Sequence, residues 1–110
     1  MMSKDNFMEI FHEGKVFKVL DADYTLRYKE LSDRAGECEH YSKEIHLDLS
    51  AYDDAESYDR IDLFYLKTLR HELIHAFFFE LGLEQYAQDE ILADALAIKM
   101  PQLRQLMELI

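Results

Sequence analysis

The first half of the chain alternates between apolar and polar residues over short stretches, which predicts β-strands. The most regular stretch is residues 44–49, where successive side chains would point to opposite faces of a sheet. One face would carry Ile45, Leu47 and Leu49, and the other would carry Glu44, His46 and Asp48. Residues 24–28 alternate in the same way, and residues 7–11 and 15–20 are predicted to form a hairpin around Glu13-Gly14.

The middle of the second half predicts one long helix. Apolar residues cover most sides of residues 61–81, which indicates that this helix is central and buried. Asp59 is suited to cap its first turn, because a short acidic side chain can accept hydrogen bonds from free backbone N–H groups. Gly82 is suited to end it, because glycine adopts the left-handed conformation that follows many helices.

Two shorter helices are predicted after this central one. Asp89 can cap a helix that runs to about Lys99, and Pro101 ends that helix or begins the next. A final amphipathic helix is indicated by apolar residues at helical spacing, namely Leu103, Leu106, Met107 and Ile110. Because strands come first and helices follow, the order favours an α+β fold.

Composition narrows the class of protein. The 110 residues predict a single domain spanning positions 1–110. The 23 acidic residues exceed the 12 Lys and Arg, and the net charge of -11 argues against a nucleic-acid partner, which requires positive charge. Cys38 is the only cysteine, which excludes an internal disulfide and fits a reducing compartment. No apolar leader is present, and residues 61–83 carry too many ionisable groups to cross a membrane, so we expect a cytoplasmic protein without a membrane partner.

The chemically informative motif is His71-Glu72-Leu73-Ile74-His75, within the predicted central helix. Residues four apart lie on one helix face, so His71 and His75 can both bind one metal ion. Glu72 lies about 100° further round the helix, where its carboxylate can reach a metal-activated water as a general base. Two ordinary surface histidines are the alternative interpretation, and chance produces this pattern in only roughly 2% of shuffled chains of this composition.

A catalytic zinc site requires a third protein ligand and an open position. Glu90 and Asp94 share a face of the next predicted helix, so that Glu90 can complete the site. Asp94 can then accept a hydrogen bond from the ring nitrogen of a histidine ligand that does not bind the metal. Solvated helix surface is the alternative for both acids. Cys38 is a weaker candidate ligand, because it lies far upstream in a predicted loop.

Hydrolysis of a peptide bond also requires a donor for the developing oxyanion. The candidates are Tyr86, just before the helix that carries Glu90, and His46, His40 or Tyr41, near the predicted strand 44–49. Each of them has an ordinary alternative role in packing or at the surface.

These motifs resemble those of gluzincin-type zinc metallopeptidases, in which H-E-x-x-H is followed by E-x-x-x-D on a second helix. The stretch from Glu90 to Pro101 is similar to the ImmA/IrrE-type metallopeptidases. Gly36-Glu37-Cys38-Glu39, Lys43-Glu44-Ile45 and residues 69–77 resemble small zincin-like proteins encoded by phages and prophages. The resemblance covers about residues 24–103.

The resemblance implies a minimal zincin-like domain, with a short N-terminal sheet packed on the H-E-x-x-H helix and two C-terminal helices. It implies Zn²⁺ bound by His71, His75 and Glu90, with Glu72 as general base and Asp94 beside a ligand histidine. It further implies that residues 44–49 form a sheet edge to which a peptide substrate adds as an extra strand.

Two functions are therefore expected from the sequence. The first is a small intracellular zinc metallopeptidase that acts on a peptide or protein with Glu72 as general base. The chain has no room for the large second lobe of thermolysin-type enzymes, which motivates the alternative. In that alternative, zinc joins two helices of a non-catalytic protein that holds a protein partner on its edge strand.

Overall fold

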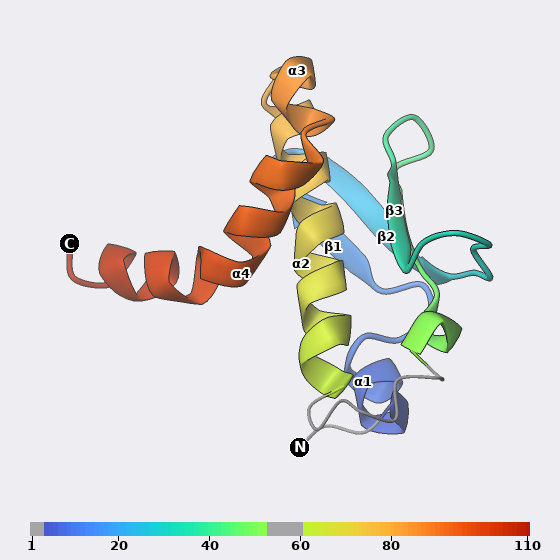
Figure 1. Ribbon diagram of the computed structural model, residues 1–110. Coiled ribbons are helices and arrows are strands. Elements are labelled where there is room, and N and C mark those ends of the chain that lie inside the picture. Colours follow the sequence, from blue (N-terminus) through green and yellow to red (C-terminus); the bar gives the residue numbers. More distant parts are fainter. Residues whose placement is uncertain (1–3, 53–60) are drawn as a thin grey trace.

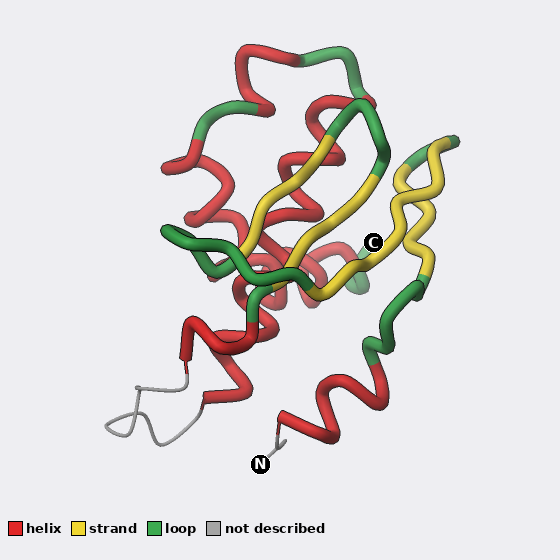
Figure 2. The backbone as a smooth tube through the Cα atoms, turned by 90° about the vertical axis from the view of Figure 1, so that its right-hand side faces the viewer, coloured by secondary structure: helices red, strands yellow, loops and turns green. Residues whose placement is uncertain are grey.

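The computed structural model describes residues 4–52 and 61–110 and has an α+β architecture, which confirms the expected class. The long helix α2 packs against one face of a four-stranded sheet, and α4 packs against α2 (Figure 1); Figure 2 shows the strands lying in front of the helices. The elements in chain order are α1 (Lys4–Ile10), β1 (Val16–Val19), β2 (Ala22–Tyr28), β3 (Gly36–Glu39), β4 (Glu44–Leu47), the 3-10 helix η1 (Leu49–Tyr52), α2 (Ile61–Glu80), α3 (Glu84–Ala87) and α4 (Glu90–Met107).

The sheet has the strand order β1-β2-β4-β3, so β4 is an internal strand. β4 runs parallel to β2 on one side and antiparallel to β3 on the other. The expectation that residues 44–49 form a sheet edge is therefore wrong, and β3 forms the edge on this side. Ile45 and Leu47 are almost completely buried, as is common for the side chains of an internal strand. The Gly-Glu-Cys-Glu sequence of β3 has the polar character of an edge strand.

The main core lies between the sheet and α2. Side chains of β2 and β4 meet those of α2, and six of these core residues are at most 3% exposed, namely Tyr24, Leu26, Ile45, Leu47, Tyr65 and Leu69. The predicted apolar face of residues 45, 47 and 49 is thus confirmed, since Leu49 is also buried. α2 is likewise the central helix, as its apolar pattern predicts.

The polar face predicted for residues 44–49 is less solvated than expected. His46 is 4% exposed and lies between the carboxylates of Glu37 and Glu44, at 2.6 and 2.8 Å. Asp48 is 6% exposed and accepts hydrogen bonds from the backbone N–H groups of Leu31 and Ser50. Neighbouring strands and the loop before β3 therefore cover these polar groups, which alternation within a single strand does not reveal.

The first predicted strand, residues 7–11, is wrong, because α1 occupies this part of the chain. Phe7 and Phe11 lie four residues apart and pack on one helix face, with ring centroids 4.9 Å apart. Phe7 also contacts Tyr65 of α2, at 5.3 Å between centroids. Two aromatics spaced by four suit a strand and a helix equally, so the pattern alone was ambiguous. The observed hairpin joins β1 to β2, with Leu20 in a left-handed conformation at its turn.

Gly82 ends α2 as predicted, with a φ of +82°. Its N–H donates to the carbonyl of Phe79, and the N–H of Leu83 donates to the carbonyl of Phe78. These two bonds form a Schellman motif, which satisfies carbonyl groups left free at the end of a helix. The predicted cap at the other end, Asp59, lies outside the described residues.

α4 begins as predicted and ends differently. Asp89 caps it, since its side chain accepts a hydrogen bond of 2.9 Å from the N–H of Leu92. The helix does not stop at Pro101 but continues to Met107, so the two predicted helices are one. Figure 1 shows that α4 changes direction along its length. Proline causes such a kink because it lacks an N–H group and its ring clashes with the preceding turn.

Over the described ranges, no helix combines the length and the apolar character that crossing a membrane requires.

Candidate metal centre and adjoining groove

α2 and α4 bring three ligand-type side chains to one point. His71 and His75 lie one turn apart on α2, and Glu90 is the first residue of α4. The two Nε2 atoms are 3.0 Å apart. Carboxylate oxygens of Glu90 lie 2.8 Å from Nε2 of His71 and 3.1 Å from Nε2 of His75. The three residues predicted as ligands from the sequence are therefore neighbours in space.

The geometry of this cluster fits a zinc ion. In a tetrahedral site, bonds of about 2.0–2.1 Å place neighbouring ligand atoms roughly 3.3 Å apart. The three observed separations, 2.8, 3.0 and 3.1 Å, differ from that value by a few tenths of an ångström. Two imidazoles and one carboxylate are also a donor set of catalytic zinc sites, which keep a fourth position open.

Hydrogen bonding to the backbone sets the tautomer of His75. Its Nδ1 lies 2.5 Å from the carbonyl oxygen of Ala87, and a carbonyl can only accept, so Nδ1 carries the proton. In the neutral ring, Nε2 then presents a lone pair toward Glu90 and His71. Lone pairs and a carboxylate that converge in this way repel one another unless a proton or a cation lies among them. The cluster is thus arranged to hold positive charge.

The turns between α2 and α4 place Glu90 beside the two histidines. The Schellman motif at Gly82 reverses the chain after α2, and α3 then brings the carbonyl of Ala87 over His75. The cap by Asp89 starts α4 at the point where Glu90 faces the two histidines. Beyond Glu90, α4 packs closely against α2, where Ala93 and Ala97 are buried against Ile74. Small residues let α4 approach α2 closely enough for one ion to join them.

Asp94 lies beside His71, as predicted, but the contact is long. Its Oδ1 is 3.5 Å from Nδ1 of His71, which is beyond the usual range of a hydrogen bond. The same oxygen is 3.3 Å from Nζ of Lys67, one turn earlier on α2. Lys67 and His71 therefore share one carboxylate oxygen, a competition that the sequence motif does not indicate.

Glu72 projects from α2 beside the cluster, and it is 6% exposed. The pKa of Glu72 is raised to about 8, chiefly by burial and also by the nearby carboxylates of Glu90 and Glu37, while Arg34 lowers it. A divalent cation at the cluster would favour the ionised carboxylate and lower this pKa. A buried carboxylate with a raised proton affinity, next to a cation site, is suited to accept and release a proton.

β3 passes closely over Glu72 at Gly36. A Cβ atom at this position would lie 2.8 Å from Cγ2 of Thr68 and 3.1 Å from both Cγ and Oε2 of Glu72. The 2.8 Å contact is shorter than real Cβ contacts and the 3.1 Å contacts are tight, so any residue larger than glycine here would force β3, Thr68 or Glu72 to shift. Gly36 therefore determines how near the backbone of β3 comes to the candidate base.

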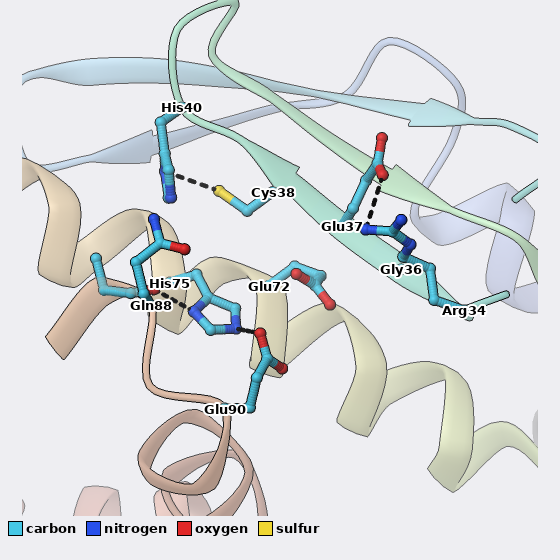
Figure 3. A pocket seen from close by; sticks show the side chains of 10 residues that line it. Arg34, Gly36, Glu37, Cys38, His40, Glu72, His75, Gln88 and Glu90 are labelled. Carbon is cyan, nitrogen blue, oxygen red and sulfur yellow. Dashed lines mark hydrogen bonds and ion pairs between the residues drawn. The ribbon is translucent and has the colours of Figure 1, made fainter. Parts of the chain in front are cut away.

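A groove runs past Glu72 between β3 and the helices. It consists of two adjoining pockets of about 350 and 290 Å³, and both are lined by Arg34, Gly36, Glu72 and Glu90. Figure 3 shows Glu72 and Glu90 in the middle, with His40 and Gln88 at one end and Arg34 at the other. The candidate base thus opens onto a space that can admit an extended chain.

Of the oxyanion donors considered from the sequence, His40 lines this groove, whereas His46, Tyr41 and Tyr86 do not. His46 lies on the opposite face of the sheet, because it neighbours Ile45, which packs toward α2. Tyr41 is 89% exposed in the turn after β3, where it contacts the ring of Phe79. Tyr86 is 44% exposed and packs against Phe78. The assignment of these three side chains to the site is therefore not supported by their positions.

His40 and several further polar side chains reach the groove. His40 lines it and stacks on Phe79, with centroids 4.4 Å apart, and burial lowers the pKa of this histidine. Gln88 faces the groove from the loop before α4 (Figure 3). Cys38 lines it as well, but burial raises the pKa of its thiol to about 12, which keeps it protonated. Arg34 and Gln88 belong to no sequence motif, so only the folded structure shows that they line the groove.

No protein family model, curated protein or solved structure matches this chain.

Proposed function

We propose that this protein is a small zinc-dependent hydrolase that cleaves peptide bonds in the cytoplasm. The observation that carries the proposal is the convergence of His71, His75 and Glu90 beside the buried carboxylate of Glu72, at the floor of a groove. The resemblance to gluzincin motifs supports the same interpretation, and so does the tautomer of His75, which leaves Nε2 available for a metal.

The residues have separate roles in this proposal. His71, His75 and Glu90 would hold a zinc ion, which would act as a Lewis acid that polarises the scissile carbonyl and acidifies water. Glu72 takes a proton from the attacking water while the water oxygen bonds to the carbonyl carbon. Glu72 then delivers that proton to the amine nitrogen as the C–N bond breaks. Asp94 lies 3.5 Å from Nδ1 of His71, where it contributes negative charge beside this ring and shares the same oxygen with Lys67.

The edge strand β3 supports a peptide as the substrate. The carbonyl of Ala35 accepts from the N–H of Asp48, so Ala35 and Asp48 form a bonded pair of the antiparallel ladder. By the alternation of such a ladder, Glu37 also bonds toward β4, whereas the backbone of Gly36 and Cys38 points away from it. An extended peptide can pair with these outward groups and cross the groove beside Glu72.

The second candidate is a zinc-bound protein without catalysis that binds a protein partner. The observation that favours it is that the ligands belong to two helices, so an ion would join α4 to α2. Metal binding would then contribute mainly to the stability of the folded state. The edge strand would hold the partner as it would hold a substrate.

Metal content and peptide hydrolysis test these proposals. Purified wild-type protein should contain one zinc per chain, and His75→Ala should contain none. With labelled casein as substrate, Glu72→Gln should keep the zinc and lose the hydrolysis, while Glu84→Gln, an exposed acid on α3, serves as the matched control. Absence of stoichiometric zinc after zinc loading would refute both candidates. Zinc retained without hydrolysis by the wild type would favour the second.

A further inference from the structure

His40 lines the groove at the end opposite Arg34, and contacts with α2 fix its position. It lies in the turn that joins β3 to β4. Its ring stacks on Phe79 of α2, with centroids 4.4 Å apart and planes 7° from parallel. Lys43, at the end of the same turn, forms an ion pair with Glu80, and its Nζ lies 4.8 Å from the ring centroid of Phe79. Two contacts with α2 therefore hold this turn, so the ring of His40 has a defined place.

Helical periodicity brings this ring close to the candidate metal cluster. Phe79 follows His75 by four residues on α2, so their Cβ atoms lie on one helix face, roughly 5–6 Å apart. Because His40 stacks on Phe79, it lies beside His75. Both histidines line the same pocket as Glu72. Figure 3 shows the ring of His40 directed from its turn toward Gln88, on the side of the pocket where His75 lies. His40 therefore faces the space in which a substrate would meet the candidate base.

The thiol of Cys38 sets the tautomer of His40. Its Sγ forms a hydrogen bond of 3.4 Å with Nδ1 of His40. Thiols are protonated at neutral pH, and burial raises the pKa of this one to about 12. A ring nitrogen is a better acceptor than a thiol sulfur, so the S–H group donates and Nδ1 accepts. Burial also lowers the pKa of His40, which keeps the ring neutral. Nε2 then carries the only ring proton and presents an N–H donor to the groove.

We propose that His40 donates a hydrogen bond to the developing oxyanion when a peptide is cleaved in this groove, and that Cys38 holds it in the required tautomer. The inference rests on the proposed hydrolase function. The proton stays on Nε2 throughout, because the N–H group only donates to the carbonyl oxygen while that oxygen carries negative charge. His40 is thus a catalytic residue and Cys38 a positioning residue. The turn after the edge strand supplies this donor in a chain too short for a second lobe.

Heteronuclear NMR of the imidazole nitrogens tests the tautomer without any catalysis. In the metal-free protein at neutral pH, His40 should be protonated at Nε2 and not at Nδ1. Cys38→Ser keeps a donor beside Nδ1 and should keep this tautomer, whereas Cys38→Ala removes the donor and should give a mixture of both tautomers. A wild-type ring protonated at Nδ1, or a tautomer unaffected by Cys38→Ala, would overturn the proposed role of Cys38.

Steady-state kinetics of the zinc-loaded protein with labelled casein tests the catalytic role. His40→Phe keeps an aromatic ring on Phe79 but has no donor, so kcat should fall by about 10²–10³-fold while the zinc content stays unchanged. His40→Gln restores an N–H donor and should recover part of the loss. His12→Phe, the same change at an exposed histidine before β1, is the matched control. A wild type that hydrolyses casein and a His40→Phe variant with full kcat, or with a change confined to KM, would overturn this inference and leave the proposed function standing.

Binding of a transition-state analogue gives a readout that does not require turnover. A phosphinic analogue of a casein peptide that the wild type cleaves carries a tetrahedral anion in place of the scissile bond. Its dissociation constant for zinc-loaded His40→Phe should exceed that for the wild type by a factor similar to the fall in kcat. Equal affinity of the two proteins for the analogue would overturn the inference. A zinc-loaded wild type that neither cleaves casein nor distinguishes peptides would overturn the proposed function, and this inference with it.

Discussion

Gly36→Ala is the most direct test of how β3 is placed over the candidate base. The added methyl group would meet Cγ2 of Thr68 at 2.8 Å and two atoms of Glu72 at 3.1 Å. Gly36 belongs to the edge strand and Thr68 and Glu72 belong to α2, so the clash can be relieved only by moving the strand or by rotating those side chains. Either response enlarges the distance between β3 and α2 or displaces the carboxylate of Glu72.

The magnitude follows from this crowding. Adding a methyl group to a well-packed site costs about 1–3 kcal/mol, and the loss of glycine's excess entropy in the unfolded chain offsets roughly 0.5–1 kcal/mol. We expect a net destabilisation of about 1–2 kcal/mol. For a domain of this size that corresponds to a fall of the melting temperature by roughly 4–10 °C.

Thermal and urea unfolding of the metal-free protein measure this change without involving catalysis. Thr68→Ser removes the Cγ2 atom but keeps the hydroxyl that donates to the carbonyl of Phe64. In the Thr68→Ser background, Gly36→Ala should therefore cost about 1 kcal/mol less than in the wild type, which is a coupling that a double-mutant cycle detects. Gly82→Ala is a control, because a Cβ there meets nothing within 4 Å and only the φ of +82° is unfavourable.

The reasoning would be refuted by a Gly36→Ala variant as stable as the wild type, or by costs in the two backgrounds that are equal. In the first case β3 would not approach α2 as closely as described. In the second case Thr68 would not be the residue that limits the approach. With the zinc-loaded protein and casein, the same substitution should reduce hydrolysis more than it reduces zinc content, because it acts on Glu72 and not on the ligands.

Three further predictions concern metal binding, helix capping and pH. Zinc at about 100 times its dissociation constant should stabilise the wild type by roughly 2.7 kcal/mol and His75→Ala by almost nothing, and equal shifts of the melting temperature would contradict the ligand assignment. Asp89→Ala should lower the free energy of unfolding in urea by about 0.5–2 kcal/mol. It should also weaken zinc binding, because the capped turn carries Glu90; unchanged zinc affinity would show that the cap does not help to position this ligand. Hydrogen bonds from Lys43 and Tyr24 lower the pKa of Glu80, so their stabilisation is present above the ordinary carboxyl pKa and is lost as pH falls below it. Glu80→Gln should flatten the acid side of the stability curve, and an identical acid side would show that this carboxylate has no such role.

Features that depend on a few neighbouring residues were predictable. The cap at Asp89 and the end of α2 at Gly82 follow from backbone groups that are free at every helix terminus, so residue type is sufficient. The closeness of His71 and His75 to each other follows from helical periodicity alone. Glu90 was predicted on a second helix, and its approach required only that this helix pack on the first.

Features that depend on competition between distant segments were not predictable. The local sequence of residues 7–11 suits a strand and a helix about equally well. The contact between Phe7 and Tyr65 of α2 favours the helix. Pro101 was expected to separate two helices, but α4 tolerates it with a change of direction. His46 appeared to be a surface residue near the site, and its burial between two carboxylates depends on which strands flank β4.

The sequence by itself determined the α+β class, the central helix and the side-by-side placement of His71 and His75, because periodicity and capping act within about one turn of chain. Only the tertiary structure decided that β3 is the sheet edge over Glu72, and that His40, Gln88 and Arg34 line the groove. Strand order depends on contacts between segments far apart in the chain, such as those that bury Ile45 and Leu47, and local patterns do not contain that free energy.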